Sequence, residues 1–277
     1  MMGPSHSMSG AAAWLGATAI FTYNTGTTIA TPALILGTAV AAGAALAPDI
    51  DSYGSTVVRS FGAFGRVLYW IANSLSLFVH GILHTRKDNP IENGHRTLFH
   101  TTLLAILMGG LVTLSTLNQD TTELWGASYS WGTISALIFL GIFLHLALGG
   151  LFVKPISKAR SKFGPYLMMV FSAGITIAIA FSMQTANIST DNYAWLGIAV
   201  AFGWFIHLMG DFITKMGVPL LFPIPWRGRM WWNFATPSFM RITAGGTVEN
   251  LFLMPAFTVL TIGLATWHIL YGMGVIK

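Results

Sequence analysis

The sequence predicts an all-α fold: a polytopic membrane helical bundle of about seven transmembrane helices plus one interfacial helix, in a single integral membrane domain over residues 1–277. Two observations predict it. Of the 277 residues, 54% are hydrophobic and only 8% are charged, whereas soluble chains carry about a quarter charged residues. Apolar segments also recur at the length of about 20 residues that a helix needs to cross a bilayer. No long linker or internal repeat divides the chain.

Six segments are long and apolar enough to span the membrane, namely residues 28–47, 98–117, 131–153, 165–183, 193–213 and 250–275. Residues 7–23 form a shorter seventh candidate that is bounded by polar residues. Residues 61–84 are also apolar, but they are interrupted by Arg66, Asn73, Ser74, Ser76 and His80. These interruptions, with Arg59 and Arg66 near the start, favour a helix that lies in the interface over an eighth span.

Basic residues set the expected orientation. They precede the spans that start at residues 98, 165 and 250, as Arg86, Lys87 and Arg96, then Lys154, Lys158, Arg160 and Lys162, then Lys215, Arg227, Arg229 and Arg241. The connections 118–130 and 184–192 contain no Lys or Arg. The positive-inside rule puts the three basic connections in the cytoplasm. The N-terminus is then inside and the C-terminus outside, in a multi-pass protein of the inner (plasma) membrane.

The net charge of +5 is read as this orientation signal and as attraction to anionic headgroups. Membrane lipids are therefore expected partners and nucleic acid is not. The chain has no cysteine, which excludes disulfides and thiolate ligands. The first ten residues contain no Lys or Arg, so a removable signal peptide is not expected.

Ionisable side chains at membrane depth are costly and indicate function. They occur in five places: His6; Asp49 and Asp51; His95 and His100; His207 and Asp211; Glu249. His207 and Asp211 are four apart, so they project from one face of a helix. The topology, derived from Lys and Arg alone, brings all five places to the cytoplasmic face. This convergence predicts one site rather than scattered polar residues.

Imidazoles and carboxylates without thiolates suit a divalent metal, zinc first and Mn²⁺ or Fe²⁺ next. The predicted ligands are His6, Asp51, His95, His100, His207, Asp211 and Glu249. These exceed the four ligands of one tetrahedral ion, so two or more ions can share them. Simpler roles compete for two carboxylates: Asp49, which follows Pro48, can merely end a helix, and Glu249 can favour a helix N-terminus.

Three motifs carry a family resemblance: Pro48-Asp49-Ile50-Asp51, His95-Arg96-x-x-x-His100, and His207-x-x-x-Asp211-x-x-Thr214-x-x-Gly217-Val218-Pro219-Leu220-Leu221-x-Pro223. Together with His6 they resemble the YdjM family of inner-membrane, metal-dependent hydrolases, associated in some bacteria with the LexA (SOS) regulon. That family is distantly similar to the zinc-dependent phospholipase C and P1 nuclease group. The sequence departs from the family at Thr97, Phe99 and Thr101, where Gly, Thr and Ser are usual.

The resemblance implies a helical bundle whose His and Asp side chains converge on metal. The expected function is a phospholipase C-like, metal-dependent hydrolase that cleaves a phosphoester of a lipid-like substrate at the cytoplasmic membrane face. Asp49 is the expected general base, with Asp51 as the alternative where it is not fully engaged with metal. Arg96 is expected to clamp a phosphate oxygen, with lipid headgroup contact as the alternative. Oligomeric state is left open.

Two other functions compete with hydrolysis. A transporter or ion path would place charged residues near span centres, whereas here only His145 lies well inside a span. A membrane scaffold with a structural metal would use the same ligands without catalysis. The remaining histidines, His80, His84, His145 and His268, are read as ordinary polar residues, and the segment 222–233, with its tryptophans, as an aromatic belt or a flap over the site.

Overall fold

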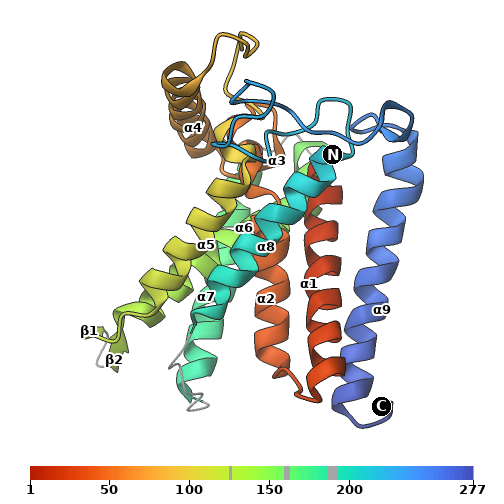
Figure 1. Cartoon of the computed structure of the whole chain (residues 1–277). Helices are drawn as coiled ribbons and strands as arrows, with labels where there is room; N and C mark the ends of the chain where they lie inside the picture. The colour runs from red at the N-terminus through yellow and green to blue at the C-terminus, as the bar shows by residue number, and fades with distance from the viewer. Residues whose placement is uncertain (125–126, 159–162, 186–192, 277) are drawn as a thin grey trace.

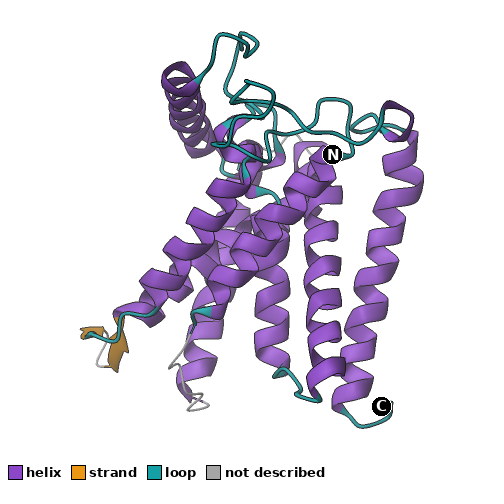
Figure 2. Cartoon of the chain, in the orientation of Figure 1, coloured by secondary structure: helices purple, strands orange, loops and turns teal. Residues whose placement is uncertain are grey.

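The computed structural model describes residues 1–124, 127–158, 163–185 and 193–276. The chain is mostly helical (Figures 1 and 2). In order, the elements are α1 (Gly3–Thr25), α2 (Thr31–Ala44), η1 (Ala47–Asp51), α3 (Thr56–Ser60), α4 (Gly62–Leu83), η2 (Leu98–His100), α5 (Thr102–Thr116), β1 (Thr121–Leu124), β2 (Ala127–Ser130), α6 (Trp131–Lys158), α7 (Gly164–Thr185), α8 (Trp195–Phe212), η3 (Ser238–Met240), η4 (Glu249–Leu253) and α9 (Met254–Gly272).

Five helices in the described part of the chain are long and apolar enough to cross a membrane. They are Thr31–Asp51, Gly62–Leu83, Trp131–Phe152, Trp195–Phe212 and Glu249–Gly272. Thr102–Thr116 and Gly164–Ala180 are shorter apolar helices. A polytopic helical membrane fold is therefore confirmed at this level. The predicted segment 61–84 is one of the five by length and composition.

Several helix boundaries differ from the sequence expectation. Residues 98–100 form a separate turn, because Thr101 is extended (φ −112°, ψ 147°) and its hydroxyl accepts the N–H of Leu104, which starts α5 at Thr102. The helix α6 continues to Lys158, beyond the predicted end at residue 153. The last span begins with a π-helical turn at Glu249. The predicted loop residues Arg160, Lys162 and 186–192 lie outside the described residues.

A short hairpin is the one sheet among the described residues, and the all-helical expectation misses it. The strands β1 and β2 pair antiparallel within the connection that precedes α6. Figure 1 shows this hairpin and the C-terminus at one end of the bundle. The N-terminus, α3, α4 and the long segment between α8 and α9 lie at the other end.

The helix α2 lies centrally and packs against α1, α6 and α8. Glycines allow these backbones to touch: a Cβ on Gly43 would lie 2.0 Å from the Phe143 carbonyl oxygen, and one on Gly203 would lie 2.3 Å from that of Ala41. Small residues permit such close helix approach in membranes, where no hydrophobic effect drives association. This packing places the last turn of α8 beside the start of α1 and the end of α2, where the ionisable residues lie.

Candidate metal centre

Side chains from α1, η1, the α4–α5 connection and α8 converge at the N-terminal end of the bundle. They are His6, Asp49, Asp51, His95, Arg96, His100, His207 and Asp211. The polypeptide turns into this site because α2 ends at Ala44 and Pro48 starts the turn η1. The sequence prediction that these residues share one end of the bundle is confirmed by their contacts.

Two imidazoles form the centre of the site. His100 Nε2 and His207 Nε2 are 3.1 Å apart, and both rings are fully buried. Asp49 Oδ1 lies 3.7 Å from the first nitrogen and 3.8 Å from the second. Asp211 Oδ2 lies 3.6 and 3.7 Å from the same two atoms. Metal–ligand bonds of about 2.0–2.2 Å in a tetrahedral zinc site separate neighbouring ligand atoms by about 3.3–3.6 Å, so these spacings fit one bound ion.

The protonation of His207 is fixed by its backbone partner. Its Nδ1 lies 2.8 Å from the carbonyl oxygen of Ala45, which can only accept, so Nδ1 carries the proton. Nε2 is then a lone-pair donor directed at the site. Metal-binding histidines usually donate their other N–H in this way, which fixes the ring and its tautomer.

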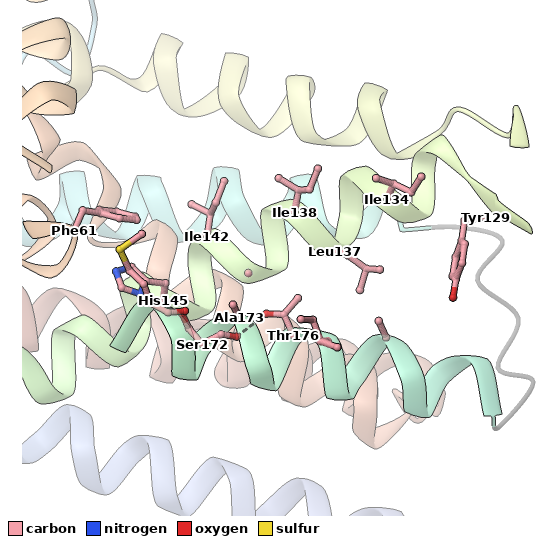
Figure 3. Close-up of a pocket in the computed structure, with 14 residues that line it drawn as sticks. Phe61, Tyr129, Ile134, Leu137, Ile138, Ile142, His145, Ser172, Ala173 and Thr176 are labelled. Atoms are coloured by element: carbon pink, nitrogen blue, oxygen red, sulfur yellow. Dashed lines mark hydrogen bonds between the residues drawn. The ribbon is translucent and has the colours of Figure 1, made fainter. Parts of the chain in front are cut away.

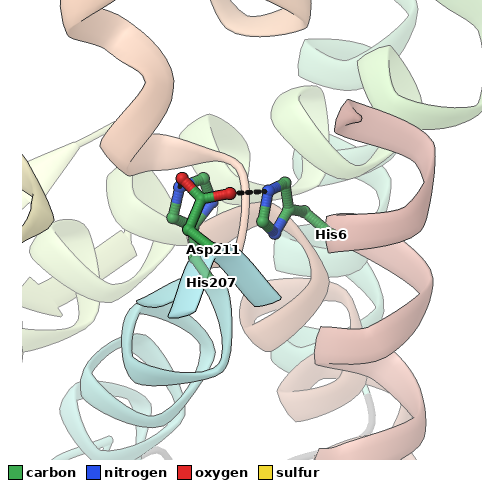
Figure 4. A group of neighbouring side chains, drawn as sticks. All are labelled: His6, His207 and Asp211. Carbon is green, nitrogen blue, oxygen red and sulfur yellow. Dashed lines mark ion pairs between the residues drawn. The ribbon is translucent and has the colours of Figure 1, made fainter. Parts of the chain in front are cut away.

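Asp211 directs its two oxygens to different partners. Oδ2 faces His100 and His207, while Oδ1 contacts the Met1 ammonium group and lies 3.3 Å from His6 Nε2. Figure 4 shows one carboxylate oxygen of Asp211 directed at His6. The rings of His6 and His207 stack at 3.8 Å between centroids. Both His6 nitrogens are buried without a hydrogen-bond partner. Buried imidazole nitrogens are rarely left unpaired, so a ligand role for His6 fits this donor set.

Asp51 lies on the far side of His100. Its Oδ1 is 2.8 Å from His95 Nδ1, and its Oδ2 is 3.3 Å from His100 Nδ1. The two nitrogens of His100 therefore face separate carboxylate groups. Asp51, His95 and His100 form a third group with metal-ligand spacing. His95 is its most exposed member, with 28% of its side chain accessible.

Arg96 reaches the centre from the connection between α4 and η2. Its Nη2 lies 3.0 Å from Asp211 Oδ2, and its Nη1 donates to Thr214 Oγ1 at 2.8 Å and to the Gly217 carbonyl at 3.2 Å. Its Nε is buried without a hydrogen-bond partner. The residue has a positive φ of 59°, which non-glycine residues seldom adopt. Sequence reasoning assigned no role to Thr214, although it lies in the third motif.

Glu249 lies apart from the three groups. Its carboxylate accepts the N–H groups of Met2 at 2.6 Å and Gly245 at 2.7 Å. It is fully buried, and it ties the beginning of α1 to the segment before η4. In the described structure its oxygens are thus engaged by backbone donors rather than by the imidazoles of the site.

The remaining histidines and the aromatic segment have local partners. His145 contacts Ser172 and the Ser60 carbonyl, and His268 contacts Thr18 and the Leu15 carbonyl. In the segment 222–233, Trp231 stacks on Phe222 and lies 5.2 Å from the His80 ring of α4. These ring contacts join the segment to α4.

The comparisons with known proteins agree with the motifs. The model of the YdjM inner membrane protein family matches residues 1–157, more than half of the 277-residue chain. The match contains His6, Asp49, Asp51, His95, Arg96 and His100. His207 and Asp211 follow it in sequence, and the fold joins them to it. No curated protein and no solved structure matches the chain significantly. The chain belongs to the YdjM inner membrane protein family.

Proposed function

We propose that this chain is a membrane-bound, metal-dependent hydrolase that cleaves a phosphoester of a lipid-like substrate at the cytoplasmic face of the inner membrane. The observation that carries the proposal is the spacing of Asp49 Oδ1, His100 Nε2 and His207 Nε2, which lie 3.1–3.8 Å from one another in a buried site. Unpaired buried nitrogens on His6 support it further.

The donor set suits zinc, with Mn²⁺ or Fe²⁺ as other candidates. His100, His207 and Asp211 are the proposed ligands of one ion, with Asp49 beside it. His6 and the Oδ1 of Asp211 are proposed to hold a second ion. Asp51 and His95 complete the third group, whereas Glu249, predicted as a ligand, is left out of the proposed set because its oxygens accept backbone N–H groups. A bound divalent ion lowers the pKa of a water molecule and offsets phosphate charge.

The carboxylates differ in access to solvent, and this difference supports separate roles. The Asp49 side chain is 16% exposed, against 2% for Asp211 and 0% for Asp51. Asp49 is therefore the proposed general base, because a group that exchanges protons with solvent must be reachable from it. The buried Asp51 faces the Nδ1 atoms of His95 and His100 and is proposed to orient these rings. Arg96 orients Asp211, and its unpaired Nε is the proposed contact for a phosphate oxygen.

The proposed topology has seven spans plus the interfacial helix α4, with the N-terminus in the cytoplasm. The short helices α5 and α7 and the 23-residue α1 complete the set of spans. An interfacial α4 is supported by its contacts with α3, η1 and η2, which all lie at the N-terminal end of the bundle (Figure 1). Its apolar residues Trp70, Phe78 and Ile82 are exposed, as a helix embedded in an interface requires.

The test is hydrolysis by purified full-length protein in detergent micelles. A phospholipid and a soluble phosphodiester are offered with Zn²⁺, with Mn²⁺ and with chelator. Metal-dependent release of the leaving group is expected from the wild type and from His268→Ala, but not from His207→Ala. If the protein holds metal at full stoichiometry and cleaves neither substrate, the hydrolase proposal fails and a structural metal in a scaffold remains.

A further inference from the structure

A largely apolar groove runs between α6 and α7, away from the metal centre. It has a volume of about 470 Å³. Figure 3 shows Phe61 and His145 at one end and Tyr129 at the other, with Ile134, Ile138 and Ile142 along one wall. Among the described residues, the charged or titratable groups that line it are His145 and Tyr129. None of the proposed metal ligands contributes to its walls.

A second cleft of about 680 Å³ lies near the His145 end of the groove. Two pairs of neighbouring residues join the cavities. Phe61 lines the groove and Gly62 lines the cleft. On α7, Met169 lines the groove and Tyr166, one turn earlier on the same helical face, lines the cleft. The two cavities therefore lie next to each other, and together they offer an apolar groove with a polar cleft at its end.

Arg59 and Arg66 both line the cleft, and both are exposed. Among the described residues neither arginine forms an ion pair with a carboxylate. Arg59 makes only a 3.3 Å hydrogen bond from its Nε to the Ser55 carbonyl. Two unneutralised guanidinium groups beside a membrane-facing groove attract an anion.

We propose that this surface binds one anionic phospholipid, separately from the metal centre. The lipid phosphate lies between Arg59 and Arg66, and one acyl chain follows the groove between α6 and α7. The groove wall from Ile134 to His145 covers twelve residues of α6, and the eleven steps between them span about 16 Å at 1.5 Å per residue. That is about half of the ~30 Å hydrocarbon core, the length available to a chain from one leaflet. Tyr53 and Tyr166 line the cleft, and tyrosine favours headgroup depth.

The experiment is native mass spectrometry of the full-length protein in detergent with equimolar phosphatidylglycerol and phosphatidylcholine of identical acyl chains. The wild type should retain one phosphatidylglycerol and little phosphatidylcholine. The Arg59→Ala, Arg66→Ala double variant should retain phosphatidylglycerol at least about tenfold less, because two charges at a membrane surface together contribute about that factor or more. The charge-matched control is Arg86→Ala with Lys215→Ala, which removes two exposed cations outside the cleft and should bind as the wild type does.

A second pair of variants tests the acyl-chain part. Ala173 lines the groove, whereas a side chain at the neighbouring Gly174 would meet nothing within 4 Å. Ala173→Trp should displace the lipid, and Gly174→Trp, which adds the same bulk to α7 outside the groove, should not. Glycerol phosphate should fail to compete, since it lacks an acyl chain. Equal retention of the two lipids by the wild type, or undiminished phosphatidylglycerol in the arginine or Ala173 variants, would overturn the proposal. Effective competition by glycerol phosphate would overturn it as well, because the site would then recognise phosphate alone.

Discussion

Arg96 Nη2 lies 3.0 Å from Asp211 Oδ2, and both side chains are buried. The same guanidinium donates to Thr214 and to the Gly217 carbonyl. One arginine from the α4–α5 connection thus fixes both the last turn of α8 and the chain that follows it. Because His207 lies one turn before Asp211 on α8, this contact also fixes the position of His207 at the centre of the proposed metal site.

Removal of this arginine should be strongly destabilising. Arg96→Ala removes one of the two cations beside the buried carboxylate of Asp211 and leaves the Met1 ammonium group as the other. Deleting one partner of a buried ion pair costs up to about 3–5 kcal/mol. Arg96→Lys keeps the charge but loses the planar fork, so its stability should be intermediate. Reversible unfolding in mixed detergent micelles measures both. Arg86→Ala, at an exposed position in the same connection, is the control. If the Arg86→Ala and Arg96→Ala variants had the same free energy of unfolding, the importance of the buried ion pair would be contradicted.

Metal content should depend on the imidazoles of the centre. His207→Ala and His100→Ala each remove a predicted ligand, so the remaining groups no longer offset dehydration of the ion. Elemental analysis of purified protein should show a loss of bound metal in both variants. His268→Ala should leave metal content unchanged, because His268 contacts Thr18 and the Leu15 carbonyl and none of the proposed ligands. Full metal in the first two variants would place the ion elsewhere.

The role of Asp51 can be distinguished from that of the proposed metal ligands by measuring the affinity for metal rather than the amount of metal bound. If His100 binds the ion through Nε2, its Nδ1 proton faces Asp51, which lies 3.3 Å away. Removing a carboxylate that orients a metal-binding histidine lowers affinity by about 10–100-fold. We therefore expect Asp51→Asn to weaken metal binding by this factor in a chelator competition. Complete loss of metal would instead make Asp51 a ligand, with His95, in the third group.

Much of the fold could be predicted, because the lengths of the apolar segments and the positions of the basic loops indicate which segments span the membrane. The predicted spans 131–153 and 193–213 correspond to α6 (Trp131–Lys158) and α8 (Trp195–Phe212). The sequence did not reveal where helices break. The start of α5 at Thr102 depends on one hydroxyl that accepts the Leu104 amide. A polar side chain inside an apolar run carries no visible sign that it will cap rather than continue a helix.

For the site, the sequence predicted which residues gather and not how they pair. Spacing placed His207 and Asp211 on one helical face, and the structure shows them together. The sequence did not reveal that Asp211 directs separate oxygens at His6 and at His100. It also did not reveal that Glu249 accepts backbone N–H groups rather than joining the histidines. These pairings depend on how the helices α1, α2 and α8 pack against one another. Glycines allow this close packing, and no local sequence pattern encodes it.

The glycine contacts predict a contrast between two helical positions. A Cβ on Gly203 would lie 2.3 Å from the Ala41 carbonyl oxygen, so Gly203→Ala must push α8 away from α2. The shift should destabilise the fold and also reduce metal content, because His207 lies one turn further along α8. Gly110 on α5 has nothing within 4 Å of its Cβ position. Gly110→Ala should therefore unfold at the same denaturant concentration as the wild type or a higher one. Similar losses at both positions would argue against the close crossing.

The proposed orientation can be tested directly, because the chain has no native cysteine. Ser128 lies on the hairpin, and Ser238 lies in the long segment between α8 and α9, at the opposite end of the bundle (Figure 1). Both serines are exposed. In intact spheroplasts a membrane-impermeant maleimide should label Ser128→Cys, whereas Ser238→Cys should react only after lysis. The reverse pattern would place the metal centre on the outer face.

Asp88 should make the contact between α4 and the aromatic segment dependent on pH. Burial alone raises the pKa of Asp88, but the N–H groups of Thr85, Met230 and Trp231 donate to its carboxylate and hold its pKa below the ordinary value of 3.8. Because the pKa of Asp88 is lower in the folded state, its ionised carboxylate stabilises the contact above pH 3.8. This stabilisation is lost as the pH falls through the pKa of Asp88 in the folded state.

Hydrogen exchange can follow this contact. In Asp88→Asn the amides of Met230 and Trp231 should be less protected than in the wild type at neutral pH, because the acceptor has lost its charge. The difference in protection factor should shrink as the pH falls below 3.8, since the wild-type carboxyl then also becomes neutral. Glu92→Gln neutralises an exposed carboxylate in the same connection and should leave both amides unchanged. A difference that persists undiminished in acid would mean that shape, and not the charge of Asp88, holds Trp231 against α4.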